Sequence, residues 1–446
     1  MTYKLYKKLC AAAFGLLLAA PAHQALAQKS KYLTLNEAIE LSIKSSGTLK
    51  IANAKVDEAI AQYHEAWNNH LPDVKVSGAY LRVDNPTVDL KVKLGGSSSD
   101  TAKQSSAIKV NQVAYGMVTA SLPLFSGFRI KYGVESAKFL EQATRLDAER
   151  DKQELIQNTI SAYNNLYKAE ISVQLVQENL NQQKQRVTDF TNLEKNGLLA
   201  RNDLLKAQLQ QSNIELSLLD AQNNLSITTM NMALMLGLPE DTQLTPDTTA
   251  FQHLTDAGKI VEWEQVALNN RKDVASLSYR EKAATSAIKS AKGEYYPGIA
   301  LTGGYVAADI PGLLTVTNAV NAGIGLQYNF ATFWKTGAKI QEAKARLHQI
   351  QANEGLLSDQ VRLEINRDYQ AYILSLNKIQ VYAKAVEQAN ENYRITKNKY
   401  DNSLVTTTDL LEADVAQLQA KLNYTFSKAD AFVAYKKLEQ TAGTIK

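Results

Sequence analysis

The sequence has little cysteine, little proline and no long hydrophobic run. Its one cysteine, Cys10, lies in an N-terminal segment that we expect to be removed, so disulfides and thiolate metal sites are excluded from the mature chain. The eight prolines leave residues 124–238 and 312–446 proline-free, which permits very long helices. No later segment reaches about 18 consecutive apolar residues, so no transmembrane helix is expected. If the chain spans a membrane, it must do so with β-strands.

Residues 1–27 have the layout of a secretory signal peptide. Three lysines precede an apolar stretch at residues 9–20, which is too short to span a bilayer, and small residues ending in Ala-Leu-Ala at 25–27 precede Gln28. We therefore expect export, with a mature chain that begins at Gln28. Without the three lysines, 46 basic and 45 acidic residues remain, a net charge of +1. This balance gives no support to nucleic-acid binding, which requires an excess of basic residues.

The rest of the chain is a duplication. Residues 71–80 match residues 296–305 at an offset of 225, and residues 202–207 match residues 408–413 at an offset of 206. The offsets differ by 19 residues, so the first copy contains an insertion between the two matched regions.

The insertion includes residues 95–99, Gly-Gly-Ser-Ser-Ser, a composition that favours a flexible loop. A polar, turn-rich segment separates the two copies and is interpreted as a connector. The predicted boundaries are residues 28–240 for the first repeat, 241–258 for the connector and 259–446 for the second repeat.

Each copy is predicted to contain a long helical hairpin. Apolar residues at alternating spacings of three and four form a narrow seam, as in a coiled coil, and the remaining positions are rich in Gln, Asn, Lys and Glu. The first helix of each hairpin ends at a small turn, at residues 196–197 and 402–403. The hairpins are expected over about residues 130–237 and 337–443.

Two strand-like segments precede each hairpin, with apolar residues alternating with small or polar ones. The four strands are expected over about residues 73–83, 113–125, 298–307 and 320–331. This alternation suits strands of an outer-membrane barrel, in which Tyr80, Tyr305 and Tyr328 would anchor at the membrane interface. It is equally typical of a soluble antiparallel sheet, whose core the tyrosines would fill.

Four strands cannot close a membrane barrel, because the smallest have about eight. An open sheet edge in lipid is prohibitively costly, since its backbone groups find no hydrogen-bond partner. A membrane-spanning form of this chain therefore has to be an oligomer.

With these features the chain resembles the TolC family of outer-membrane efflux proteins. The resemblance rests on residues 33–39, residues 122–127 and the two tip motifs at residues 196–207 and 402–413. It implies a mainly α-helical fold with a β-barrel: a homotrimer with a twelve-stranded barrel in the cell outer membrane, in contact with lipid. That barrel would continue into a periplasmic α-helical barrel, with residues 240–258 and the C-terminus in a mixed belt around it.

Two departures from the family pattern stand out. The Asn-Pro that often starts the first helix region is replaced by residues 46–49, and in the second copy by residues 271–274. Ser403 stands where the family has a tip glycine, which puts the turn there in question.

The function that the resemblance implies is a passive export duct of a tripartite efflux system. The hairpin tips would meet a periplasmic adaptor protein, which connects them to an inner-membrane transporter. The same architecture would serve type I protein secretion or metal efflux. An alternative of another class is a soluble periplasmic coiled-coil scaffold or adaptor, but that class does not explain why a strand pair precedes each hairpin.

The family's pore constriction maps onto Asp409 and Glu412. They are spaced i, i+3 and share a helix face. The three subunits of a trimer would therefore place six carboxylates around the pore, and these would attract cations. Alternatively, Asp409 only supports a helix start, as its counterpart Asp203 in the first copy suggests. Glu412 differs, because the first copy has Lys206 at that position.

The tip turns carry apolar residues that look exposed and that could dock an adaptor. The predicted docking residues are Gly197, Leu198, Leu199, Ser403, Leu404 and Val405. Packing that closes each hairpin is the alternative role.

The sequence contains no pattern typical of an active site. Its five histidines have no metal-ligand spacing, and it has neither a glycine-rich phosphate loop nor a serine nucleophile elbow. We therefore predict no catalytic residue, no metal, no cofactor and no enzymatic activity.

Overall fold

The computed structural model describes residues 30–84, 86, 110–251 and 255–445. The predicted signal peptide at residues 1–27 and the glycine-serine segment at residues 95–99 lie outside these residues. No helix of the described chain is both long enough and apolar enough to cross a membrane.

The chain divides into two compact units, and each takes residues from both copies of the repeat. Unit 1 consists of the residues up to Leu49 together with Lys152–Ala267 and Leu363–Lys446. Unit 2 consists of Lys50–Asp151 and Leu268–Arg362. The two longest helices, α4 (Arg129–Lys195) and α8 (Thr332–Asp401), each contribute to both units.

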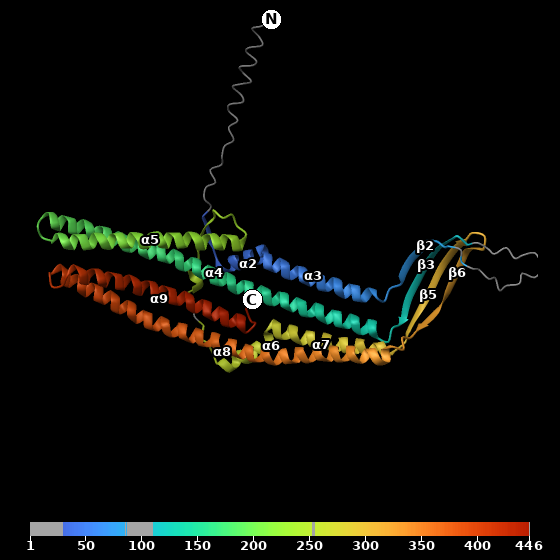
Figure 1. Cartoon of the computed structure of the whole chain (residues 1–446). Helices are drawn as coiled ribbons and strands as arrows, with labels where there is room; N and C mark the ends of the chain where they lie inside the picture. The colour runs from blue at the N-terminus through green and yellow to red at the C-terminus, as the bar shows by residue number, and fades with distance from the viewer. Residues whose placement is uncertain (1–29, 85, 87–109, 252–254, 446) are drawn as a thin grey trace, which may run out of the picture. The chain divides into compact units, whose positions relative to one another are not determined.

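Unit 2 contains a four-stranded antiparallel sheet (Figure 1). Its strands are β2 (Asp73–Arg82), β3 (Gln112–Phe125), β5 (Gly298–Ile310) and β6 (Leu314–Gln327). The order in the sheet is β2-β3-β5-β6, so the central pair joins the first copy to the second, with Val118 opposite Tyr305. This order leaves β2 and β6 as the edge strands.

β6 ends earlier than the alternation of apolar residues suggested. Its last residue is Gln327, so Tyr328 and Phe330, which the alternation placed on the strand, lie beyond its end. The reason is a turn centred on Asn329, whose side-chain Oδ1 accepts the Ala331 amide and whose carbonyl accepts the Thr332 hydroxyl. These bonds compete with the ladder and lead the chain into α8.

The helices of unit 2 lie in the same order as the strands that they flank (Figure 1). Lys55 of α3 (Gly47–Asn68) and Asp151 of α4 line one polar cleft, so these helices are neighbours. Helix α4 bonds to α7 (Lys272–Lys292), and Glu281 of α7 bonds to Gln351 of α8. The row is therefore α3-α4-α7-α8, with α3 and α8 at its ends.

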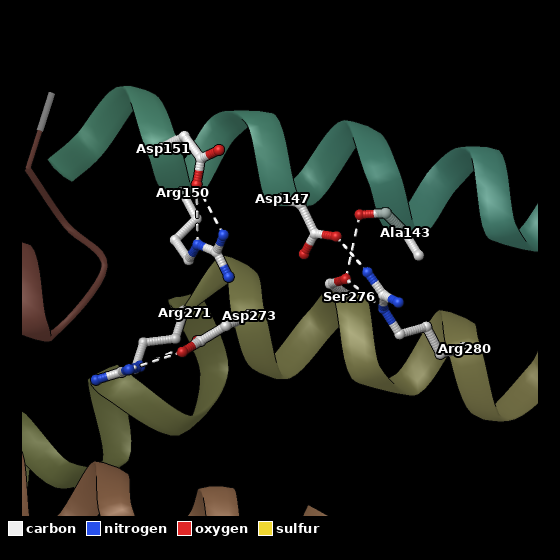
Figure 2. Close-up of polar contacts among 8 residues, drawn as sticks. All are labelled: Ala143, Asp147, Arg150, Asp151, Arg271, Asp273, Ser276 and Arg280. Carbon is white, nitrogen blue, oxygen red and sulfur yellow. Dashed lines mark hydrogen bonds and ion pairs between the residues drawn. The ribbon is translucent and has the colours of Figure 1, made fainter. Parts of the chain in front are cut away.

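Helices α4 and α7 pack closely through small residues that repeat every seven positions. The Ser136 hydroxyl donates to the Ala283 carbonyl at 3.0 Å. The Ser276 hydroxyl donates to the Ala143 carbonyl at 3.1 Å (Figure 2). At the sheet end a Cβ on Gly293 would lie 2.4 Å from the carbonyl oxygen of Gly127, so no larger residue fits without a shift of the backbone. Every step of seven residues along α4 matches seven along α7 in the opposite direction.

Unit 1 contains the two helical hairpins. The rest of α4 pairs with α5 (Arg201–Leu236), and the rest of α8 with α9 (Thr407–Thr441). Around them lie α2 (Leu35–Ser45), most of α6 (Ile260–Asn270) and a parallel pair formed by β1 (Ser30–Leu33) and β4 (Gln243–Pro246). Short 3-10 turns occupy Thr249–Phe251 here and Gly293–Tyr295 in unit 2.

Tyrosines on the long helices bind the connector between the two copies. Tyr163 of α4 is fully buried; its hydroxyl donates to the Leu33 carbonyl at 2.8 Å and accepts the Asp247 amide at 2.7 Å. Burial raises the pKa of this phenol, which therefore stays neutral. At the equivalent position of the second copy, the half-buried Tyr369 donates to the Gly258 carbonyl at 3.1 Å. The connector is thus held from both copies.

We expect Tyr163→Phe to destabilise the chain more than Tyr369→Phe. The first substitution removes two hydrogen bonds of a fully buried hydroxyl, which together are worth about 1–3 kcal/mol, while the Asp247 amide still donates to the Leu33 carbonyl at 3.0 Å. The second leaves a carbonyl that water can reach, and should cost less than about 1 kcal/mol. Denaturant unfolding followed by circular dichroism measures both losses, and equal losses would contradict the assignment of Tyr163 as the more important anchor.

Candidate functional site at the helical hairpin tips

The two hairpin tips turn in the same way, although their sequences differ. Gly197 has φ of 72°, and Ser403 has φ of 60°. In both tips the next amide, that of Leu198 or Leu404, donates to the carbonyl five residues earlier at 2.8 Å. This bond is the helix-ending pattern that favours glycine in the left-handed position. The serine therefore keeps the turn that the glycine makes, at some cost in backbone strain.

Asp409 caps the start of α9. Its Oδ2 accepts the Thr406 amide at 2.8 Å and the Thr406 hydroxyl at 2.7 Å, while its own amide donates to the Thr406 Oγ1 at 3.2 Å. The hydrogen bonds from Thr406 lower the pKa of this exposed carboxylate. Asp409 therefore has the structural role that the sequence analysis named as an alternative, and as a constriction residue it stays a prediction.

The start of α5, at the same point in the first copy, is built differently. Ala200 occupies the capping position without a side-chain bond, and Asp203 faces Lys206 at 3.4 Å instead of closing a capping box. Glu412, one turn into α9, is exposed. The second copy therefore presents two carboxylates at its tip, and the first copy presents one acid beside a base.

Only part of the predicted docking set points outward. The side chains of Leu198 and Leu404 are 74% and 73% exposed. Leu199 packs instead against a small core of Phe190, Leu204 and Ala207, which closes the first hairpin. Of the remaining predicted residues, Gly197 and Ser403 are exposed and Val405 is half-buried.

A buried polar cluster that the sequence analysis missed joins all four hairpin helices. Arg186 of α4 forms an ion pair with Asp414 of α9 at 2.9 Å, and their side chains are only 10% and 2% exposed. Arg186 also donates to the Gln183 Oε1 at 2.9 Å and to the Tyr393 hydroxyl of α8 at 3.0 Å. Gln183 in turn donates to the Ala207 carbonyl of α5 at 2.9 Å.

This cluster fixes the register of the hairpins. Desolvating two charges costs several kcal/mol per ion, and only a well-made pair with satisfied hydrogen bonds offsets that cost. Sliding one helix by a turn would break the bonds and leave the charges buried. A sequence signal was present, because Gln183 occupies a position of the apolar seam between Leu180 and Val187, and a polar residue in such a seam commonly specifies register.

The three predicted interface tyrosines lie in unit 2. Tyr80 on β2 is exposed and donates to the Gln112 side chain at 2.8 Å. Tyr305 on β5 lies 3.3 Å from the Asn318 side-chain oxygen. Tyr328 lies after β6 and packs edge-on against Phe330 and Phe333. Their role at a membrane surface stays a prediction.

Within the part of the chain that the structure describes, no group of three or more His, Cys, Asp or Glu side chains is placed to hold a metal ion.

The known proteins to which this chain is similar include several outer membrane proteins. The chain is 22% identical over 338 residues to the outer membrane efflux protein BepC of Brucella suis biovar 1 (strain 1330), covering 74% of this chain and 73% of BepC. Its fold is similar to that of the outer membrane protein VceC of Vibrio cholerae, with a TM-score of 0.74 at 18% identity over 92% of this chain and 96% of VceC. The Campylobacter jejuni CmeC outer membrane channel gives a TM-score of 0.76 at 16% identity, over 92% and 85%.

The family model described as outer membrane efflux protein matches residues 38–238 and 263–444, one stretch in each copy of the repeat. These two stretches make up most of the chain and include both hairpins with their tips. The chain therefore belongs to the outer membrane efflux protein family, and it is an efflux protein of the outer membrane.

Proposed function

We propose that the chain works as a homotrimeric, passive export duct, joined to a periplasmic adaptor and through it to an inner-membrane transporter. The observation that carries this proposal is the four-stranded sheet with two unpaired edges. Family membership supports the efflux role, and the argument from the sheet supports the trimer.

Both edge strands of the sheet expose apolar side chains. Val76 on β2 is 80% exposed and Val320 on β6 is 77% exposed. The other exposed apolar residues on these strands are Val74, Tyr80, Leu81, Leu314, Ile324 and Leu326. An apolar face of this kind suits lipid, where each unpaired edge would have to find a partner strand.

The size of the pore rules out a ring of two subunits. Two subunits would give an eight-stranded barrel, and side chains just fill a barrel of that size. Three subunits give twelve strands, the smallest ring of whole subunits that leaves a lumen. Strand β6 of one subunit would pair with strand β2 of the next subunit, as β3 pairs with β5 within the chain.

The duct is proposed to carry out no chemistry of its own. Its partners are recognised at the hairpin tips, where the exposed Leu198 and Leu404 offer apolar contact to an adaptor. Leu199 closes its hairpin and is left out of the proposed docking surface.

Asp409 and Glu412 are proposed to line the narrowest point of the duct. Both carboxylates are exposed at the start of α9, and the three subunits of the trimer would bring six of them together. Asp409 would be both cap and constriction residue, since its carboxylate keeps its charge while it accepts the bonds from Thr406.

Fractionation of the expressed protein tests the trimer, because a sheet with two open edges is stable in lipid only when closed. We expect the processed chain in the outer membrane, with the mass of a trimer in detergent by native mass spectrometry or light scattering. A monomer recovered from the periplasmic fraction would sink the duct proposal and favour a soluble scaffold.

We expect Glu412→Gln to reduce the preference of the pore for cations. Two unit charges about 4 Å apart in water interact by about 1 kcal/mol, so losing the carboxylate should lower the cation-to-anion permeability ratio by up to about fivefold. Reversal potentials of trimers in planar bilayers under a potassium chloride gradient measure this ratio.

The matched control is Asp203→Asn, the same position in the first copy as Asp409, which should leave the ratio unchanged. In the Glu412→Gln variant, residual selectivity should persist to low pH. The lowered pKa keeps Asp409 ionised below about pH 3.9, the usual pKa of an aspartate. Equal effects of Asp203→Asn and Glu412→Gln would refute the constriction assignment.

A further inference from the structure

We propose that unit 2 binds the headgroups of anionic phospholipids at the junction where its helices meet the sheet (Figure 1). The centre of this surface is a pair of lysines, Lys131 of α4 and Lys289 of α7, which lie over one aromatic ring. The proposal rests on the proposed duct and adds the class of lipid that the periplasmic rim of its barrel selects.

The register of the sheet separates an apolar face from a polar one. Two apolar rows across three strands are Val118 with Tyr305 and Val320, and Leu122 with Leu301 and Ile324. The opposite face carries small and polar residues, among them Thr119, Thr302 and Asn321. In a barrel with water inside, the apolar face has to be the one in contact with lipid.

The apolar face continues to the end of the sheet that adjoins the helices. Ile299 follows two residues before Leu301 on β5, so the two share a face. Phe125, the last residue of β3, lies opposite Ile299, which in turn lies opposite Leu326. Phe125 therefore marks the edge of the apolar face toward the helices.

A path of aromatic rings leads from this edge to the two lysines. The ring of Phe128 lies 5.2 Å from that of Phe125 and 6.5 Å from that of Tyr132, between centroids. Lys131 Nζ lies 5.7 Å and Lys289 Nζ 5.4 Å from the centroid of the Tyr132 ring, so one headgroup can contact both. The order is apolar face, aromatic rings, cations, which matches hydrocarbon, interface and headgroup in a bilayer.

The backbone at Phe128 is strained in the position that exposes this ring. Its φ is 65°, in the left-handed region that a bulky residue rarely adopts, and its side chain is 48% exposed. The close approach of Gly127 to Gly293 imposes the turn, because a Cβ on Gly127 would overlap the Gly293 carbonyl. The turn holds an exposed ring between the apolar face and the lysines.

The junction is strongly basic, although the mature chain as a whole is nearly neutral. Residues 129–134, 287–295 and 332–339 contain six basic residues and one acid. The acid, Glu294, forms an ion pair with Lys339 at 2.7 Å. The other five basic residues are exposed, and none forms an ion pair within the part of the chain that the structure describes: Arg129, Lys131, Lys289, Lys292 and Lys335. These side chains are available to an anion from outside the chain.

Helix dipoles account for only two of these cations. Lys289 and Lys292 lie in the last turn of α7, where the dipole stabilises a positive charge without any ligand. Arg129 and Lys131 lie in the first turn of α4, which contains no acid and where the dipole disfavours a positive charge. Two cations at this position cost helix stability, and contact with an anion would offset that cost.

An anionic phospholipid has the chemistry that this surface requires. Its acyl chains can cover the apolar face and the aromatic rings while its phosphodiester reaches the lysines. A zwitterionic phospholipid carries an ammonium group beside its phosphate, which the same lysines repel. A soluble phosphate would leave the rings uncovered. In the proposed duct the helices lie on the periplasmic side, so the lipid belongs to the periplasmic leaflet.

Native mass spectrometry of the detergent-purified trimer, titrated with single lipids, tests the surface. We expect phosphatidylglycerol to bind at least about tenfold more tightly than phosphatidylethanolamine with the same acyl chains. Lys131→Gln combined with Lys289→Gln should raise the Kd for phosphatidylglycerol about thirtyfold, because each basic residue near an anionic lipid surface contributes about fivefold. Lys131→Arg combined with Lys289→Arg keeps both charges and should bind like the unsubstituted chain.

The matched control is Lys138→Gln combined with Lys282→Gln. These lysines lie one heptad farther from the sheet on the same two helices, and Lys282 Nζ lies over the Tyr279 ring at 4.6 Å. Seven residues correspond to about 10 Å along a helix, a distance at which salt largely screens the attraction. The control should therefore keep the Kd for phosphatidylglycerol within about twofold.

The same measurements separate the possible failures. Equal binding of the two lipids, equal losses in the control and in the Lys131 and Lys289 variant, or displacement of the lipid by inorganic phosphate would overturn the surface and leave the duct proposal standing. If the double glutamine variant does not assemble, each single variant should lose about fivefold, and a loss in neither overturns the surface. A monomer for the unsubstituted chain overturns the proposed trimer, and the lipid surface with it.

Discussion

Backbone hydrogen bonding at the two ends of unit 2 is the constraint on which the rest of the molecule depends. Among the residues that the structure describes, β3 and β5 each have a partner strand on both sides, whereas β2 and β6 each have one side without a partner strand. Lipid supplies neither donors nor acceptors, so in the proposed duct this sheet is closed by the sheets of further subunits. The helices obey the same logic, because α3 and α8 end the row of helices as β2 and β6 end the sheet. The proposed boundary between subunits would thus provide partners both for the edge strands and for the end helices.

In the proposed trimer, the duplication lets each chain supply two similar parts of the ring that can still differ from each other. Contacts between the two copies of the repeat, such as that of Ser276 with Ala143, hold them together inside unit 2. The copies can diverge wherever the ring does not depend on them. They differ at the hairpin tips, where Thr406 and Asp409 form a capping box in the second copy while Ala200 and Asp203 form none in the first.

The sequence predicted the fold class because its signals are local or repeated. Heptad spacing, alternation and the two offsets identified the duplicated strand pair and long hairpin, and the family match and the fold of the relatives confirmed that architecture. The end of β6 at Gln327 was missed because the turn at Asn329 depends on side-chain bonds that alternation does not detect. The ion pair between Arg186 and Asp414 was missed because its members are 228 residues apart, although the polar Gln183 in the seam marked its place.

The buried cluster and the exposed tip carboxylates place different demands on the same short region. Arg186 and Asp414 need a fixed register, since any slip of a helix would leave desolvated charges without partners. Asp409 and Glu412 lie five and two residues before Asp414 on α9, so a fixed Asp414 also fixes where these exposed carboxylates point. A constriction that selects by charge requires such positioning, because electrostatic attraction in water falls off within about 10 Å. The buried pair would then act on the duct through geometry, by holding the helix that carries the charges.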